Sequence, residues 1–296
     1  MIAVSLYELH HRPDLDAPIL LVALDGWIDA GGAAARAVES IVAQGESTHV
    51  ATFDADALLD FRARRPILHL VDGVNTGLTW SATELHATVA PNGTDVLLLT
   101  GVEPDHAWNA FADSVLALAV ELGCRMQIGL GAYPAAAPHT RPVQLSATAS
   151  TDDLAAQVGL VRGTVDVPAG IEAVLEQRFA GIGLPAVGVW AQVPHYVAAM
   201  RYPAAAARLI EGLNLVAGTD FGTEDLDTEI GAMRTRIDEL VESNPQHVAM
   251  IRQLEEAYDE SLEAMAGDEP SLGGGELPSG DELAEELQRF LREQGD

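Results

Sequence analysis

The sequence predicts an α/β protein of three layers, with helices on both faces of a central mixed, largely parallel sheet. Two features of the pattern support this class: continuous apolar runs of strand length, and longer stretches of helical spacing that alternate with them. Runs that are apolar throughout are typical of strands buried on both faces. The chain has 296 residues, 48% of them hydrophobic, which is ample for a large core.

The α/β core is expected to span residues 1–218. Strands are predicted from three apolar runs, at residues 19–24, 96–99 and 187–190. Helices are predicted from amphipathic spacing over residues 32–44, 106–122, 170–179 and 203–215. Pro203 suits the first turn of the last of these helices, because the first helical position needs no N–H.

One segment of the core breaks the alternation of strands and helices. Residues 67–71 and 85–89 have strand character and flank a segment rich in turn residues at 72–77. They predict an inserted β-hairpin, or ribbon, at about residues 67–89. The ribbon either projects to contact another subunit or extends the sheet, and the sequence leaves both alternatives open.

The composition changes after Gly218. Residues 219–296 hold 22 acids and 5 Arg, a net charge of -17 out of -29 for the chain. Apolar residues at steps of three and four on both sides of Asn244 and Pro245 predict an acidic helical hairpin over residues 219–266. Residues 267–296 include Gly273 to Gly275 and are predicted to be a flexible linker and an acidic tail.

The charged residues exclude several functions. All sixteen basic residues are Arg, so no lysine is present to form a Schiff base or to bind phosphate in a Walker site. A net charge of -29 argues against nucleic acid and anionic membrane surfaces as partners. His10 and His11 lie near Asp14 and Asp16, but their place near the terminus argues against a metal site, so neither metal nor cofactor is expected.

The single cysteine and the amino-terminal sequence predict the cellular compartment of the protein. Cys124 is the single cysteine, so no internal disulfide can form, and it is expected to pack as a small apolar residue. Neither a secretion signal nor an apolar stretch of membrane-spanning length is present, which predicts a cytoplasmic protein.

The first candidate site follows the first strand, in a turn that opens a helix. Such a turn presents backbone N–H groups at the carboxyl edge of a sheet, where open α/β sheets bind ligands. A polar ligand would meet Asp25, Gly26, Trp27, Asp29 and Gly31. The alternative is structural: Asp29 caps the helix and the glycines permit close packing.

The second candidate is Pro138-His139-Thr140-Arg141-Pro142. Its two prolines favour an extended segment, in which His139 and Arg141 point the same way. Proton transfer or anion binding by this segment is one interpretation, with Arg141 as the residue that holds the anion. The other is an Arg141 ion pair that fixes the loop to an acidic edge.

Further polar residues stand where other strands are predicted to end. Glu103 and Trp108 follow the run at 96–99, and His195 follows the run at 187–190. With the two candidates above they predict a polar cleft at the carboxyl edge, in which His139, His195 and Glu103 are the candidate catalytic residues. A glycine pair at Gly129 and Gly131 is only weakly similar to a dinucleotide fingerprint, since no helix follows.

These motifs resemble the proteasome assembly chaperone 2 family, in particular its actinobacterial branch. The matching segments are 26–31, 60–62 with 65–66, 103–104 with Trp108, 138–142 and 194–197. The resemblance implies a core similar to the phosphorylase/hydrolase-like fold, a homotrimer assembled through a β-hairpin, and a helical lid over a ligand site. It carries over no catalytic residue, because the bacterial members are of unknown activity.

Three functions remain open from the sequence. The preferred hypothesis is an oligomeric protein that binds a small molecule or a peptide in the polar cleft. One alternative is an enzyme of hydrolase or phosphorylase type that uses the edge carboxylates and histidines. The other is an assembly chaperone or scaffold for a protein partner.

Overall fold

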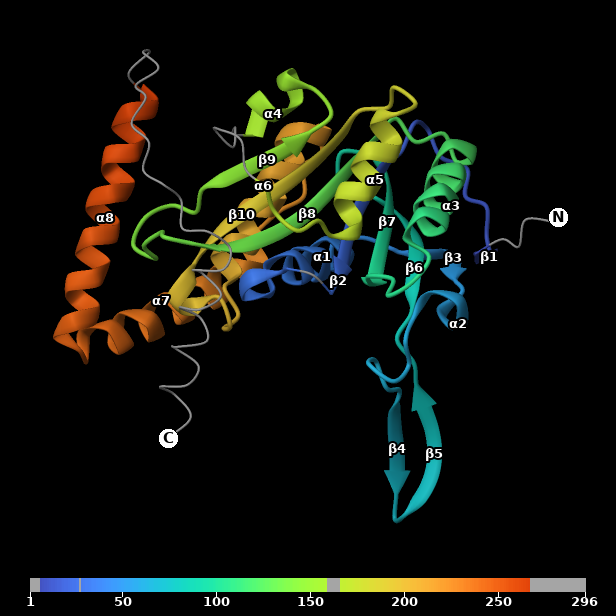
Figure 1. Ribbon diagram of the computed structural model, residues 1–296, viewed down its shortest axis with the longest axis horizontal. Helices are drawn as coiled ribbons and strands as arrows, with labels where there is room; N and C mark the ends of the chain where they lie inside the picture. The colour runs from blue at the N-terminus through green and yellow to red at the C-terminus, as the bar shows by residue number, and fades with distance from the viewer. Residues whose placement is uncertain (1–5, 27, 159–165, 267–296) are drawn as a thin grey trace.

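The computed structural model describes residues 6–26, 28–158 and 166–266 (Figure 1). Eight strands form the main sheet in the order β1-β3-β6-β7-β2-β8-β10-β9, with β7, β2, β8 and β10 parallel and the outer pairings antiparallel. The sheet is therefore mixed with a parallel centre, as predicted. Its strands are β1 (Tyr7–Leu9), β2 (Ile19–Asp25), β3 (Thr48–Phe53), β6 (Thr83–Val89), β7 (Asp95–Val102), β8 (Met126–Ala135), β9 (Leu145–Ala149) and β10 (Ala186–Pro194).

Helices cover both faces of this sheet (Figure 1). One apolar core lies under α1 and α6, and a second lies under α2, α3 and α5. Four of these helices match the four predicted ones to within a few residues. The α-helices of the core are α1 (Ala33–Ala43), α2 (Ala55–Leu58), α3 (Trp108–Glu121), α4 (Asp152–Val158), α5 (Ile171–Ala180) and α6 (Pro203–Ala217), and short 3-10 turns occupy Ala30–Gly32, His195–Val197 and Glu224–Leu226.

The inserted ribbon is shorter than predicted. It consists of β4 (Ile67–Val71) and β5 (Val74–Thr79), which pair only with each other and project from the sheet (Figure 1). The prediction that residues 85–89 form its second strand is wrong, since they belong to β6 and pair with β3 and β7 in the main sheet. Leu85 and Ala87 are buried in the core, which explains their apolar alternation.

The acidic segment forms two helices, α7 (Asp227–Glu242) and α8 (Pro245–Ala266). Leu226 and Ile237 are buried against the core that α6 helps to form. Beyond Asn244 the chain turns sharply, so α8 leads away from α7 and rises beside the loop after β8 (Figure 1). The predicted linker and tail at 267–296 lie outside the described residues.

Two smaller expectations can be compared with the structure. Cys124 is buried in the core under α3, and burial raises the pKa of its thiol to about 12, as expected of a packing residue. Among the described helices, none is long and apolar enough to cross a membrane.

Candidate functional site

Asp29 and Gly31 form a tight turn between β2 and α1. The Asp29 carboxylate accepts the backbone N–H groups of Ala34 and Ala35, at 2.8 and 3.0 Å, and so caps the helix. Gly31 has a φ of +69°, and a Cβ there would lie 2.8 Å from the Cβ of Tyr202. In this turn Asp29 caps the helix and Gly31 permits close packing, as in the structural alternative for this motif. Trp27 lies outside the described residues.

Glu103 lies at the carboxyl end of β7, beside the end of β2. Its backbone N–H donates to Asp25 O at 2.7 Å, and its Oε1 accepts the N–H of Ile171 at 2.6 Å, at the start of α5. A Cβ on Gly26 would lie 2.8 Å from the Cβ of Glu103, so a glycine allows this close approach. Burial raises the pKa of Glu103 above its ordinary value.

Two more glutamates, Glu172 and Glu176 on α5, were not singled out from the sequence; Glu172 interacts electrostatically with Asp29, Glu103 and Glu176. Burial raises the pKa of both, and that of Glu172 lies well above its ordinary range. Asp29, Glu103 and Glu176 also raise the Glu172 pKa through their negative charges. We call Asp29, Glu103, Glu172 and Glu176 the acidic cluster.

Glu172 reaches into a space that glycine leaves open. Although the residue is partly accessible as a whole, its Oε2 is closed off from solvent and has no hydrogen-bond partner among the described residues. A Cβ on Gly129 would lie 2.9 Å from that oxygen. The amide oxygen of Gln127 is buried and unpartnered as well. Gly129 therefore makes room for a carboxyl group.

His139 lies in the loop after β8 and is bonded on both sides of its ring. Tyr196 Oη accepts the backbone N–H of His139 at 2.7 Å and lies 2.7 Å from its Nδ1, while Nε2 lies 2.9 Å from Asp238 Oδ1 on α7. The simplest proton arrangement has Tyr196 donating to Nδ1 and Nε2–H donating to Asp238. These bonds link Tyr196 through His139 to Asp238 and so hold α7 against the core. The His139 side chain is only 2% exposed, so its ring is shielded from water.

Thr140 and Arg141 hold α8. Thr140 donates its hydroxyl to Glu255. The guanidinium of Arg141 binds both carboxylate oxygens of Asp259, at 2.9 and 2.7 Å, and Glu255 at 3.1 Å. Arg141 does hold anions, but they belong to its own chain, as in the alternative interpretation of the motif.

A cleft of about 620 Å³ lies between this loop, α6 and α7. Its walls carry three guanidinium groups and one carboxylate, from Arg141, Arg208, Arg234 and Glu211. The rest of its lining is mainly apolar and includes Ala204, Ala207, Ile230, Met233 and Ile237. The cleft therefore offers apolar contact together with cationic groups, beyond the carboxyl end of β8.

The remaining predicted residues have local partners. Trp108 donates its indole N–H to Pro104 O at 2.6 Å, and His195 Nδ1 lies 3.4 Å from Ala135 O. His139, Thr140 and Arg141 line the cleft, whereas Asp29 and Glu103 lie in the acidic cluster. Between these two groups no hydrogen bond or ion pair joins the predicted residues in the described part of the chain. The structure therefore divides the predicted site in two.

The fold defines a class of α/β proteins: a mixed sheet with a parallel centre, a projecting ribbon and a helical extension beside the carboxyl edge. The chain belongs to the PAC2 family, whose model matches residues 23–241. This finding confirms the resemblance seen in the motifs. No curated protein matches the sequence.

Several solved structures share this fold. The chain is similar to Mycobacterium tuberculosis Rv2714, a protein of unknown function, with a TM-score of 0.82 and 34% identity over 88% of this chain and 93% of that one. It is similar to the proteasome-assembly chaperone homologue Rv2125 of the same organism, with a TM-score of 0.74 and 33% identity over 79% and 99% of the two chains. The archaeal proteasome activator PbaB of Pyrococcus furiosus shares the fold, with a TM-score of 0.62 and 15% identity over 79% and 97%.

Proposed function

We propose that the protein is a cytoplasmic homo-oligomer of the assembly-chaperone type that binds a segment of a protein partner in the cleft. The observation that carries the proposal is the lining of the cleft, which combines three arginines with apolar side chains. Such a lining suits a peptide that carries acidic side chains next to apolar ones. The similarity to a proteasome-assembly chaperone homologue supports the same kind of function.

Two of the three arginines of the cleft, Arg208 and Arg234, are available to a peptide at modest cost, whereas Arg141 is held by Asp259 and Glu255 of its own chain. Arg208 is paired with Glu211 at 2.7 Å, with side chains that are 42% and 53% exposed, and Arg234 lies 4.0 Å from Asp238. Exposed pairs of this kind contribute little to stability, so a carboxylate of a partner can replace the internal one.

Peptide selection from a random phage-displayed library tests this proposal. We expect enriched peptides that combine Asp or Glu with apolar residues, and we expect the variant R208Q/R234Q to weaken their binding at least tenfold in fluorescence polarisation. Arg12→Gln is the matched control, because Arg12 pairs with Glu121 away from the cleft. A failure to enrich any peptide, or equal binding by R208Q/R234Q, would contradict the proposal.

The ribbon supports self-association as a trimer, the state that the family resemblance implies. Its side chains are exposed on both strands, including Ile67, Leu68, Leu70, Val71, Val74 and Leu78, at 45–63%. A monomer rarely leaves so continuous an apolar surface in water, and a second copy of the chain is the occupant that we propose.

Leu70→Glu tests the role of the ribbon. Leu70 is 58% exposed, and Leu215 on α6 is 63% exposed, so Leu215→Glu is a matched control of similar exposure outside the ribbon. We expect L70E to shift the protein towards monomer in sedimentation velocity, and L215E to keep the wild-type mass. Equal masses for all three proteins would contradict this role.

The acidic cluster favours a second candidate function, an enzyme of hydrolase or phosphorylase type. A buried carboxyl group with a raised pKa can donate a proton to a leaving group. A screen with nucleosides, esters and peptides tests this candidate, with Glu172→Gln as the inactive variant. It fails if no substrate class is turned over, or if E172Q retains the activity.

A further inference from the structure

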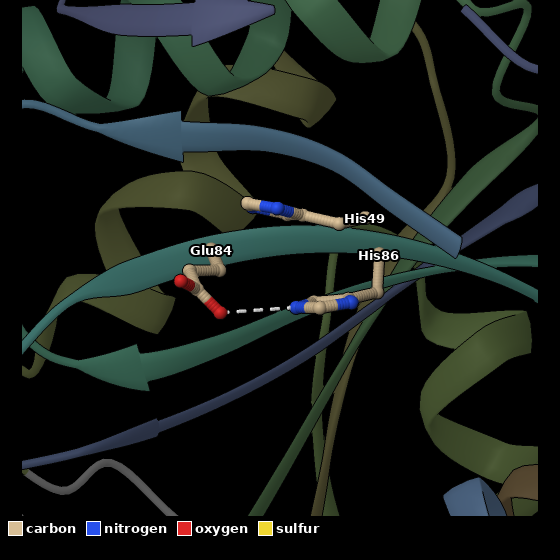
Figure 2. Close-up of side chains that lie close together, drawn as sticks. All are labelled: His49, Glu84 and His86. Atoms are coloured by element: carbon tan, nitrogen blue, oxygen red, sulfur yellow. Dashed lines mark hydrogen bonds and ion pairs between the residues drawn. The ribbon is translucent and has the colours of Figure 1, made fainter. Parts of the chain in front are cut away.

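Two histidines and a glutamate gather on the outer part of the sheet, on β3 and β6. His49 and His86 are register partners in the antiparallel ladder, and Glu84 stands two residues before His86, on the same face. Figure 2 shows the two imidazole rings stacked, with the Glu84 carboxylate at the edge of the His86 ring. One ligand atom from each side chain lies within 4.8 Å of the others.

We propose that His49, Glu84 and His86 bind a divalent transition-metal ion such as Zn²⁺. Two imidazoles and one carboxylate form a donor set that zinc uses in proteins. His86 Nε2 and Glu84 Oε2 are 3.1 Å apart. In a tetrahedral site with bonds of about 2.0–2.1 Å, ligand atoms lie about 3.3–3.4 Å apart, so these two donors already have nearly the required spacing.

His49 completes the site by a rotation of its side chain. Its ring is stacked on that of His86, with centroids 4.9 Å apart, and an imidazole binds a metal in the plane of its ring. The ring must therefore turn towards Glu84. Both strands lie in the main sheet, so the backbone positions are fixed and only side chains need to move.

Thr52 and His10 lie next to this site. Thr52 Oγ1 lies 2.9 Å from His49 Nε2 and 2.9 Å from His10 Nε2. A hydroxyl has one proton, so at least one of these imidazoles donates its N–H to Thr52 while the His49 ring is stacked, and the His49 contact must change when that ring turns. The His10 ring, with its centroid 4.6 Å from that of His49, is the nearest further donor for the fourth position, which water otherwise fills.

Access and charge also favour a cation here. The side chains of His86 and Glu84 are 26% and 39% exposed, so an ion can enter without local unfolding. The protein carries a net charge of -29, which attracts cations in general. On binding, the contact between His86 Nε2 and Glu84 is replaced by a bond from each group to the metal, and a neutral His86 then carries its single ring proton on Nδ1.

The test uses full-length protein that has no polyhistidine tag and has been treated with a chelator. We expect titration calorimetry to show one Zn²⁺ per chain, and Co²⁺ to give the visible absorption of a tetrahedral complex. Glu84→Gln and His86→Gln should each weaken binding at least tenfold. Glu84→Gln conserves shape, and melting curves of both variants establish that they are folded.

Two histidines serve as matched controls. His69 on the ribbon bonds to Thr79, and His247 is exposed on α8, so His69→Gln and His247→Gln should leave Zn²⁺ affinity unchanged. The proposal is overturned if the wild-type protein binds no Zn²⁺, or if it binds no more tightly than folded His86→Gln or Glu84→Gln protein. In either case the histidine stack serves packing alone.

Discussion

Tyr196→Phe removes the hydroxyl that connects His139 to the core, and with it the support for α7. The hydroxyl makes two contacts of 2.7 Å, with the backbone N–H and with Nδ1 of His139. His139 is 6% exposed, so its N–H and Nδ1 would lose their partner where water has little access.

The magnitude follows from these two bonds. A neutral hydrogen bond contributes about 1 kcal/mol net, and a buried donor left unsatisfied costs about 1–3 kcal/mol. We therefore expect Y196F to lower the free energy of unfolding by about 2 kcal/mol. For a chain of 296 residues that corresponds to a decrease in Tm of about 3 °C.

Urea unfolding and hydrogen exchange measure the two parts of this effect. The stability loss should be accompanied by faster exchange of amides in α7, because the Asp238 contact depends on the orientation of the His139 ring. Tyr133→Phe is the control, since its hydroxyl makes one bond, to Ser146 at 3.1 Å, and should cost less than half as much. Unchanged unfolding and unchanged α7 exchange in Y196F would refute this reasoning.

Three further predictions concern buried groups. Burial raises the pKa of Glu172 well above its ordinary value of 4.5, so the folded chain retains a proton there that the unfolded chain releases. The stability of the wild-type protein should therefore fall relative to that of E172Q as the pH rises from 4.5 towards the pKa of the folded state, by up to about 1.4 kcal/mol per pH unit. A constant difference between their denaturant midpoints from pH 5 to 8 would contradict this. Cys124, whose pKa is raised to about 12, should react with a thiol reagent at pH 8 only after unfolding, and rapid modification of native protein would show otherwise. Gly131→Ala should lower the free energy of unfolding by about 1–3 kcal/mol, because a Cβ there collides with the Trp190 ring. Gly231→Ala on α7 places its Cβ in open space and should raise the free energy of unfolding by about 0.5–1 kcal/mol. The two Tm shifts should therefore have opposite signs.

Much of the fold could be predicted because buried strands and amphipathic helices leave strong local patterns. The runs at 19–24, 96–99 and 187–190 lie in β2, β7 and β10. The ribbon was harder, since residues 67–71 and 85–89 both have strand character, although the first segment is exposed and the second is partly buried in the main sheet. Strand character is local, but the choice of pairing partner is a property of the whole sheet.

The site could be predicted only in part, for the same reason. Side chains at the carboxyl edge were located from strand ends, yet the sequence could not show that helices from other parts of the chain supply their partners. Asp238 and Asp259 are about a hundred residues from His139 and Arg141, and nothing local indicates that they meet. In the sequence, Glu172 resembles any acidic residue in the first turn of a helix. Only the structure shows that its carboxyl group is buried in the space left by the missing side chain of Gly129.

The central claim is that the cleft between the 139–144 loop, α6 and α7 binds a segment of a partner. Hydrogen exchange of the full-length protein, with and without a selected acidic peptide, tests it most directly. We expect protection concentrated in residues 139–144, 202–211 and 230–237, which contain the lining of the cleft. Protection confined to the ribbon or to the acidic cluster, or none at saturating peptide, would contradict it.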